Sequence, residues 1–152
     1  MHQKPLVWLL LFFILGIALE KVNAEEALTS QDIDTVVVKV TGIKHDYERF
    51  GLREEALIKE ISQNLEDAGF SVVDNYDDEE LTATILINLR LISSYLGYSY
   101  ALSVKMFLPH YQGRQEPLVL WSGGSSGFLR DPELSRLHDY IMEEIDKFLT
   151  SA

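Results

Sequence analysis

The sequence of 152 residues contains no cysteine. This absence excludes disulfide bonds, thiolate metal sites and cysteine nucleophiles. It also argues against lipid attachment, because a bacterial lipoprotein carries its lipid on a cysteine at the cleavage site. A secreted domain without disulfides must depend on its hydrophobic core for stability.

Basic residues are also scarce. The chain has 13 lysines and arginines against 24 aspartates and glutamates, so its formal net charge is −11. Nucleic acid and anionic lipid both repel so acidic a chain, which makes them poor partner candidates. The acidity suits a basic partner, or it simply keeps the protein soluble.

Patterns for metal or phosphate chemistry are missing as well. His45, His110 and His138 lie far apart and lack the spacing of a helical zinc motif. Residues 74–80 form an acidic run that could offer oxygen ligands to calcium, but it lacks the glycine and the distal glutamate of an EF-hand. A solvated turn explains this run better. The sequence therefore predicts no cofactor, no bound metal and no catalytic residue.

The first 24 residues have the features of a secretory signal peptide. Lys4 supplies a positive charge, residues 6–19 form an apolar run, and Val22-Asn23-Ala24 is a small-x-small cleavage site. A spanning helix needs about 20 apolar residues, which this run does not reach. We expect cleavage after Ala24, a periplasmic or secreted protein and no stable membrane anchor. The alternative is an uncleaved amino-terminal anchor.

The residues that follow predict a polar arm over 25–34 and one domain over 35–152. Alternating apolar residues in this domain are typical of strands. The predicted strands cover residues 35–43, 71–73, 82–93, 98–108 and a segment that begins at 118–121 and continues toward 129.

Two segments have the apolar spacing of amphipathic helices. The first covers residues 54–68 and is followed by Gly69, which suits a left-handed helix end, and by Phe70, which can pack back on the last turn. The second runs to about residue 150, with Asp131 as the expected N-cap and Pro132 at the first helical position.

The element order is therefore β-α-β-β-β-β-α. Because each helix has one apolar stripe to cover, we predict an α+β two-layer sandwich. A mostly antiparallel sheet of four to five strands would carry both helices on one face. The other face would mix apolar and polar side chains: Leu86, Ile92 and Phe107 with Thr84, Asn88, Arg90, Ser103 and Lys105. Such a face either meets a partner or is solvated.

Aromatic residues gather around the predicted hairpin. Tyrosines and tryptophans near a sheet end can anchor a protein interface. We therefore predict Tyr95, Tyr98, Tyr100 and Trp121 as binding residues. The alternative is ordinary cross-strand packing within the sheet.

Residues 123–127, Gly-Gly-Ser-Ser-Gly, match the G-x-S-x-G pattern of serine hydrolases. Ser125 would be the nucleophile, and Asp131 and His138 follow in hydrolase order. However, residues 128–130 separate Ser125 from the next helix, whereas a nucleophile elbow joins a strand directly to a helix. A glycine-rich strand with a bulge or a close backbone approach explains the segment better. A small hydrolase using Ser125 and His138 remains an alternative, as does a carrier that holds a small apolar ligand between helices and sheet.

Three segments carry a resemblance to known proteins: Tyr98-Ser99-Tyr100-Ala101-Leu102-Ser103-Val104, then Trp121-Ser122-Gly123-Gly124, then Ile145-Asp146-Lys147-Phe148-Leu149 at the end of the last helix. Together they resemble a family of small secreted bacterial proteins of unknown function. The element order is also similar to that of envelope-assembly accessory proteins, such as the lipopolysaccharide-assembly lipoprotein and curli-secretion types. Those proteins are mostly lipid-anchored, whereas this chain has no cysteine.

The resemblance and the lack of a catalytic set lead to one functional prediction. We expect a non-enzymatic binding or envelope-assembly module that contacts another cell-envelope protein through a sheet face or a sheet edge.

Overall fold

The computed structural model describes residues 28–76, 81–111, 113 and 115–151. The predicted signal peptide, with its cleavage site, lies outside these residues. Part of the predicted polar arm and part of the acidic run 74–80 lie outside them too.

One mixed sheet contains five strands in the order β2-β1-β3-β4-β5. Strand β1 is parallel to both β2 and β3, whereas β4 is antiparallel to β3 and to β5. The two antiparallel pairings are the long ones and include nearly all of β3, β4 and β5, so the prediction of a mostly antiparallel sheet is confirmed. The strands are β1 (Thr35–Thr41), β2 (Ser71–Val72), β3 (Thr82–Ser94), β4 (Gly97–Leu108) and β5 (Leu118–Leu129).

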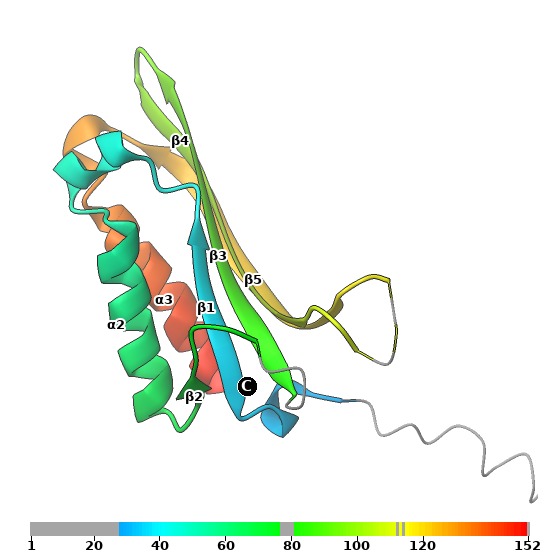
Figure 1. Ribbon diagram of the computed structural model, residues 1–152. Coiled ribbons are helices and arrows are strands. Elements are labelled where there is room, and N and C mark those ends of the chain that lie inside the picture. The colour runs from blue at the N-terminus through cyan, green and yellow to red at the C-terminus, as the bar shows by residue number, and fades with distance from the viewer. Residues whose placement is uncertain (1–27, 77–80, 112, 114, 152) are drawn as a thin grey trace, which may run out of the picture.

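Both main helices, α2 (Glu54–Asp67) and α3 (Arg136–Ser151), lie on the same side of the sheet (Figure 1). This arrangement confirms the predicted α+β two-layer fold. The described chain also has the short 3₁₀ helices η1 (Ser30–Asp32), η2 (His45–Phe50) and η3 (Asp131–Glu133). The β3–β4 hairpin extends past the end of the helical layer (Figure 1).

The core fills the space between the helices and the inner face of the sheet. Alternate residues of each strand point into it, because successive side chains of a strand point to opposite faces. The fully buried residues include Val36, Ile85, Ile87, Leu89, Val104 and Met106 from the sheet and Leu57, Ile61, Leu65, Leu137, Ile141, Ile145 and Phe148 from the helices. Burying each such side chain contributes about 1.5–3 kcal/mol, so this layer is the main source of stability.

The ends of the helices show one confirmed prediction and one correction. Gly69 has φ +102° after α2, and the N–H of Phe70 donates to the carbonyl of Leu65 at 2.9 Å, as expected for a left-handed helix end. Asp131 does not cap α3. It begins the separate turn η3, in which the carboxylate of Glu133 accepts the N–H of Arg130 at 3.0 Å, and α3 begins only at Arg136.

Candidate functional site

The sheet face that points away from the helices is the largest candidate surface. We call it the open face. The register of the strand pairs, together with the alternation of side chains along each strand, places residues of four strands on the open face. They are Lys39 and Thr41 of β1; Leu86, Asn88, Arg90 and Ile92 of β3; Ser99, Ala101, Ser103, Lys105 and Phe107 of β4; and Val119, Ser122, Gly124, Ser126 and Phe128 of β5. The sequence prediction that this face is mixed is confirmed.

The open face is basic although the protein is acidic. None of the five strands contains an aspartate or glutamate. The strands contain three cations, Lys39, Arg90 and Lys105, and all three are exposed on the open face. Arg90 and Lys105 form no ion pair with any residue in the described part of the chain.

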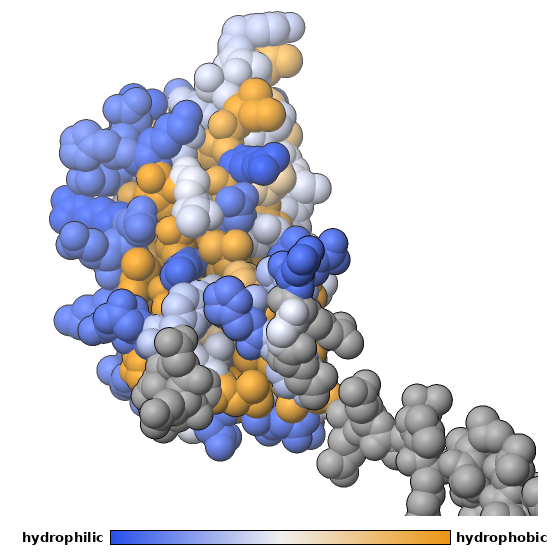
Figure 2. All heavy atoms as spheres, turned by 45° about the vertical axis from the view of Figure 1, so that its right-hand side comes forward, coloured by the Kyte–Doolittle hydropathy of each residue, from blue (hydrophilic) through white to orange (hydrophobic). Residues whose placement is uncertain are grey.

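Large apolar side chains accompany these cations. Ile92 is 70% exposed, Val119 52% and Phe128 48%. Ile92 of β3 and Phe128 of β5 both pair with Ser99 of β4, so they stand on either side of a small residue. Figure 2, in which the side away from the helices comes forward, shows hydrophobic surface between hydrophilic side chains. Exposed apolar groups gathered on one face are typical of an interaction surface.

Tyr76 covers the end of this face near the start of β3. Its hydroxyl forms a short hydrogen bond with Thr84, and its ring centroid lies 4.9 Å from the ammonium of Lys39. Thr84 is fully buried, and Val37 beside it is only 3% exposed. The uncovered part of the open face therefore runs from Leu86 toward the tip of the β3–β4 hairpin.

The tip itself carries Tyr95 and Leu96, which are 95% and 63% exposed. The hydroxyl of Ser94 holds the turn: it donates to the carbonyl of Gly97 at 3.1 Å and accepts the N–H of Leu96 at 3.3 Å. Of the four predicted binding residues, Tyr95 is thus the one presented fully to solvent.

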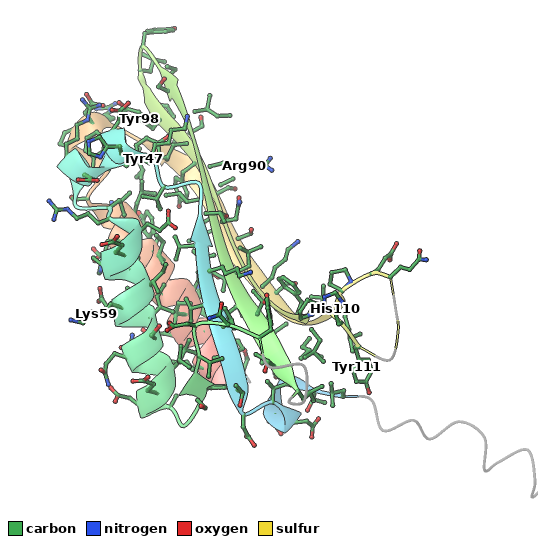
Figure 3. All side chains as sticks on the ribbon, viewed as in Figure 1. Tyr47, Lys59, Arg90, Tyr98, His110 and Tyr111 are labelled. Atoms are coloured by element: carbon green, nitrogen blue, oxygen red, sulfur yellow. The ribbon has the colours of Figure 1, made fainter. Side chains whose placement is uncertain are left out.

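The other three predicted binding residues lie on the inner face. The Tyr98 ring packs edge-on against Phe50 at 6.1 Å, and the Arg49 guanidinium donates to the Tyr98 hydroxyl at 3.4 Å. Tyr100 stacks on Tyr140 of α3 with ring centroids 5.5 Å apart. Figure 3 shows Tyr98 on the helical side of the sheet and Arg90 pointing the opposite way.

Trp121 also belongs to the helical side. Its indole N–H donates to Ser151 at 2.7 Å, and its ring lies 5.3 Å from that of Phe148. The structure therefore does not bring the four aromatic residues together on one surface, and their binding role stays a prediction. Tyr98, Tyr100 and Leu102 alternate along β4 and therefore share a face, so the sequence pattern by itself indicates an inward direction for both tyrosines.

The glycine-serine segment is part of β5, as the strand interpretation predicted. A Cβ on Gly123 would lie 2.4 Å from the Trp121 ring and 3.1 Å from the carboxylate of Glu144, so α3 approaches the strand closely there. The Ser125 hydroxyl is buried and has no hydrogen-bond partner within the described residues. His138 Nε2 is instead 2.8 Å from Glu60 of α2. The serine-histidine contact that the hydrolase alternative needs is not formed.

The contact between His138 and Glu60 predicts a pH dependence of stability. Hydrogen bonding to Glu60 raises the pKa of His138 above 6.5, against a smaller effect of burial. A raised pKa stabilises the fold fully below pH 6.5, and this contribution is lost as the pH rises through the folded-state pKa. Glu60→Gln should therefore cost up to about 1 kcal/mol near pH 6, since the pair is part-exposed, and less near pH 8.5.

Urea titrations at several pH values measure this difference. Glu55→Gln is the matched control, because Glu55 is exposed on the same helix and forms no ion pair with a described residue. A cost of Glu60→Gln that does not change with pH would contradict the assignment.

Other candidate sites receive less support. Among the described residues, no group of three histidines or carboxylates is placed to hold a metal ion.

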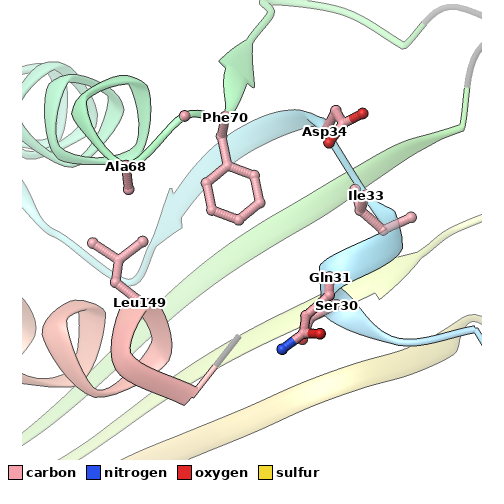
Figure 4. A pocket seen from close by; sticks show the side chains of 8 residues that line it. Ser30, Gln31, Ile33, Asp34, Ala68, Phe70 and Leu149 are labelled. Carbon is pink, nitrogen blue, oxygen red and sulfur yellow. The ribbon is translucent and has the colours of Figure 1, made fainter.

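An open cleft of about 270 Å³ lies between η1 and the carboxyl-terminal ends of α2 and α3 (Figure 4). Its lining is Ser30, Gln31, Ile33, Asp34, Ala68, Gly69, Phe70 and Leu149. Ligand pockets usually measure about 300–1,000 Å³, so this cleft gives little support to the carrier alternative.

Within the described residues, no helix has the length and apolar character needed to cross a membrane.

Comparisons with known proteins assign no family. No protein-family model matches the sequence, and no curated protein matches it either. A solved hypothetical protein of Chlamydia trachomatis is distantly similar in structure, with a TM-score of 0.43 and 9% identity over 78% of this chain and 95% of that one. A minor lipoprotein of Acinetobacter baumannii has a TM-score of 0.32 and 13% identity over 78% of this chain and 86% of that one. The resemblance noted in the sequence thus extends to distant structural similarity only.

Proposed function

We propose that the protein is a non-catalytic, periplasmic or secreted binding module that contacts another cell-envelope protein through the open face. The observation that carries this proposal is that neither of the described main helices covers that face. Both helices lie on the other side of the sheet, where they complete the core. Ile92 and Phe128 nevertheless lie on the open face, outside this core, at 70% and 48% exposure.

The size and composition of the face suit a protein partner. It extends along β3, β4 and β5, strands of 13, 12 and 12 residues. Its apolar groups can be desolvated by a complementary surface, while Asn88 and Arg90 stand among them as hydrogen-bond donors. Apolar anchors surrounded by polar groups are the usual composition of such interfaces. The proposed contact residues are thus Arg90, Ile92, Lys105 and Phe128, with Tyr95 at the adjoining tip.

A site-specific photocrosslinker tests the proposal in cells of the native host. Ala101 is exposed in the middle of the open face, and Ala56 is exposed on α2 in the opposite layer. With a photoreactive amino acid at position 101, we expect one recurrent crosslinked envelope protein at least tenfold above the level obtained at position 56. The matched alanines control for the loss of the native side chain. Equal yields at both positions, or no crosslink at position 101, would refute the proposal.

A further inference from the structure

We propose that the open face recognises an acidic, amphipathic segment of its partner protein. This inference rests on the proposed function, because it names the chemistry of the partner that would cover the same face. It is carried by the separation of charge between the two sides of the molecule.

The separation of charge is clear from the exposed side chains. The helical layer is rich in exposed carboxylates, which include Glu54, Glu55, Glu66, Asp67, Asp139, Glu143 and Asp146. The open face carries Lys39, Arg90 and Lys105 and no carboxylate from any strand. In Figure 3, Arg90 points away from the sheet on the side opposite to the helices.

A partner that covers this face must neutralise its cations. Arg90 and Lys105 are solvated at present and have no ion-pair partner among the described residues. Removing a charged group from water without supplying an opposite charge is strongly unfavourable. Since the described strands provide no carboxylate, we expect the partner to provide it. Its apolar side chains would contact Ile92 and Phe128.

The spacing of the cations favours a peptide segment with several carboxylates over a single small anion. Lys39 and Lys105 are both paired with Leu86, so their backbones are about 10 Å apart, twice the spacing of neighbouring strands. Arg90 is four residues from Leu86 along β3, which corresponds to about 13 Å. A single small anion would have to draw all three side chains together, whereas carboxylates two turns apart on a helix are separated by about 11 Å, close to the spacing of these positions.

Two other occupants fit less well. A planar anionic membrane extends past the face and is repelled by the acidic remainder of the molecule, whose formal charge is −11, whereas a peptide segment is confined to the face. A second copy could offer the carboxylates of its helical layer. However, among the described residues, neither α2 nor α3 has an exposed large apolar side chain to match Ile92 and Phe128.

Three synthetic peptides of equal length test the inference with the purified protein. Each has leucines at helical spacing, and the remaining positions are glutamate, lysine or glutamine. By fluorescence anisotropy in low salt, we expect the glutamate peptide to bind at least tenfold more tightly than the lysine peptide, and its affinity to fall as salt is added. Equal binding of the glutamate and lysine peptides would overturn the inference.

Charge reversal locates the binding. The double variant Arg90→Glu, Lys105→Glu should lower the affinity for the glutamate peptide at least tenfold. The neutral double variant Arg90→Gln, Lys105→Gln should lower this affinity to a smaller degree. Lys59→Glu is the matched control on α2, where Figure 3 shows Lys59 on the opposite side of the molecule from Arg90. Its effect should stay within twofold. Because all three positions are exposed, each variant is expected to keep the melting temperature of the wild type.

Two further measurements test the alternative occupants of the open face, an anionic membrane and a second copy of the protein. Tighter binding to phosphatidylglycerol vesicles than to the glutamate peptide, abolished by the same reversal, would replace the inference with a lipid surface. Self-association in sedimentation that the reversal abolishes would replace it with a second copy.

The in-cell crosslink separates the two proposals. A crosslink at position 101 that persists at full yield in the charge-reversed protein would leave the proposed function standing and refute the acidic partner. No crosslink in the wild type would refute the proposed function itself.

Discussion

Replacing Phe148 with alanine is expected to lower the free energy of unfolding by about 4 kcal/mol. Phe148 is fully buried in α3 and joins three parts of the core. Its ring lies 5.9 Å from that of Phe70, just after α2, and 5.3 Å from that of Trp121 in β5. Removing the ring leaves a cavity between both helices and the sheet, and surrounding side chains close such cavities only partly.

Urea denaturation followed by far-UV circular dichroism measures this loss. The control is Phe128→Ala, which makes the same change in chemistry on the open face, where Phe128 is 48% exposed. We expect it to cost less than about 1 kcal/mol. Similar decreases in the free energy of unfolding for the two variants would mean that Phe128 is packed as tightly as a core residue, contrary to the proposed function.

The second large effect is expected at Gly42, where Gly42→Ala should cost at least about 3 kcal/mol. Gly42 follows β1 and has φ +86°, a left-handed conformation that is unfavourable for residues with a Cβ. In addition, the added Cβ would lie 1.8 Å from the carbonyl oxygen of Leu89. This oxygen belongs to the backbone of β3, so relief requires that the end of β1 move away from β3.

Gly51→Ala separates the cost of the left-handed backbone conformation from the cost of the collision with Leu89. Gly51 has φ +83°, and a Cβ there would meet no atom within 4 Å. Its replacement therefore introduces the left-handed strain without the collision, at a cost of about 1 kcal/mol. The difference between the two variants, measured by urea denaturation, is the cost of the collision with Leu89. If both variants lost the same stability, the close approach of Gly42 to β3 would be refuted.

Local periodicity explains why so much of the fold was predictable. Side chains two apart on a strand share a face, so the sequence predicted that Ile85, Ile87 and Leu89 lie opposite Leu86, Asn88 and Arg90. The helices were predictable for the same reason, at a period of 3.6 residues. The start of α3 was not, because the carboxylate of Glu133 turns back to the N–H of Arg130 and leaves Asp131 in a separate turn.

The candidate site was only half predictable. The sequence predicted the mixed composition of the open face, including Arg90, Ile92 and Lys105, yet the predicted binding residues were chosen for being aromatic. The identity of a tyrosine does not indicate whether it lies in a core or on a surface, because its apolar ring suits the first and its polar hydroxyl suits the second. Alternation with the core residue Leu102 indicates that Tyr98 and Tyr100 point inward, but only the tertiary structure shows that Phe50 and Tyr140 pack against them.

The sequence by itself determined the order of elements, the two faces of each strand and the excess of acidic residues outside the strands. These properties depend on residues only a few positions apart in the chain, because the local geometry of a helix or strand sets the direction in which each side chain points. Tertiary structure decided which strands pair and which face the helices cover. It placed β1 parallel to β3 and brought Glu60 to His138. It also left Arg90 and Lys105 on one face of the sheet without an ion-pair partner among the described residues. Such contacts join residues far apart in the chain, and only the burial of the apolar stripes as a whole selects them.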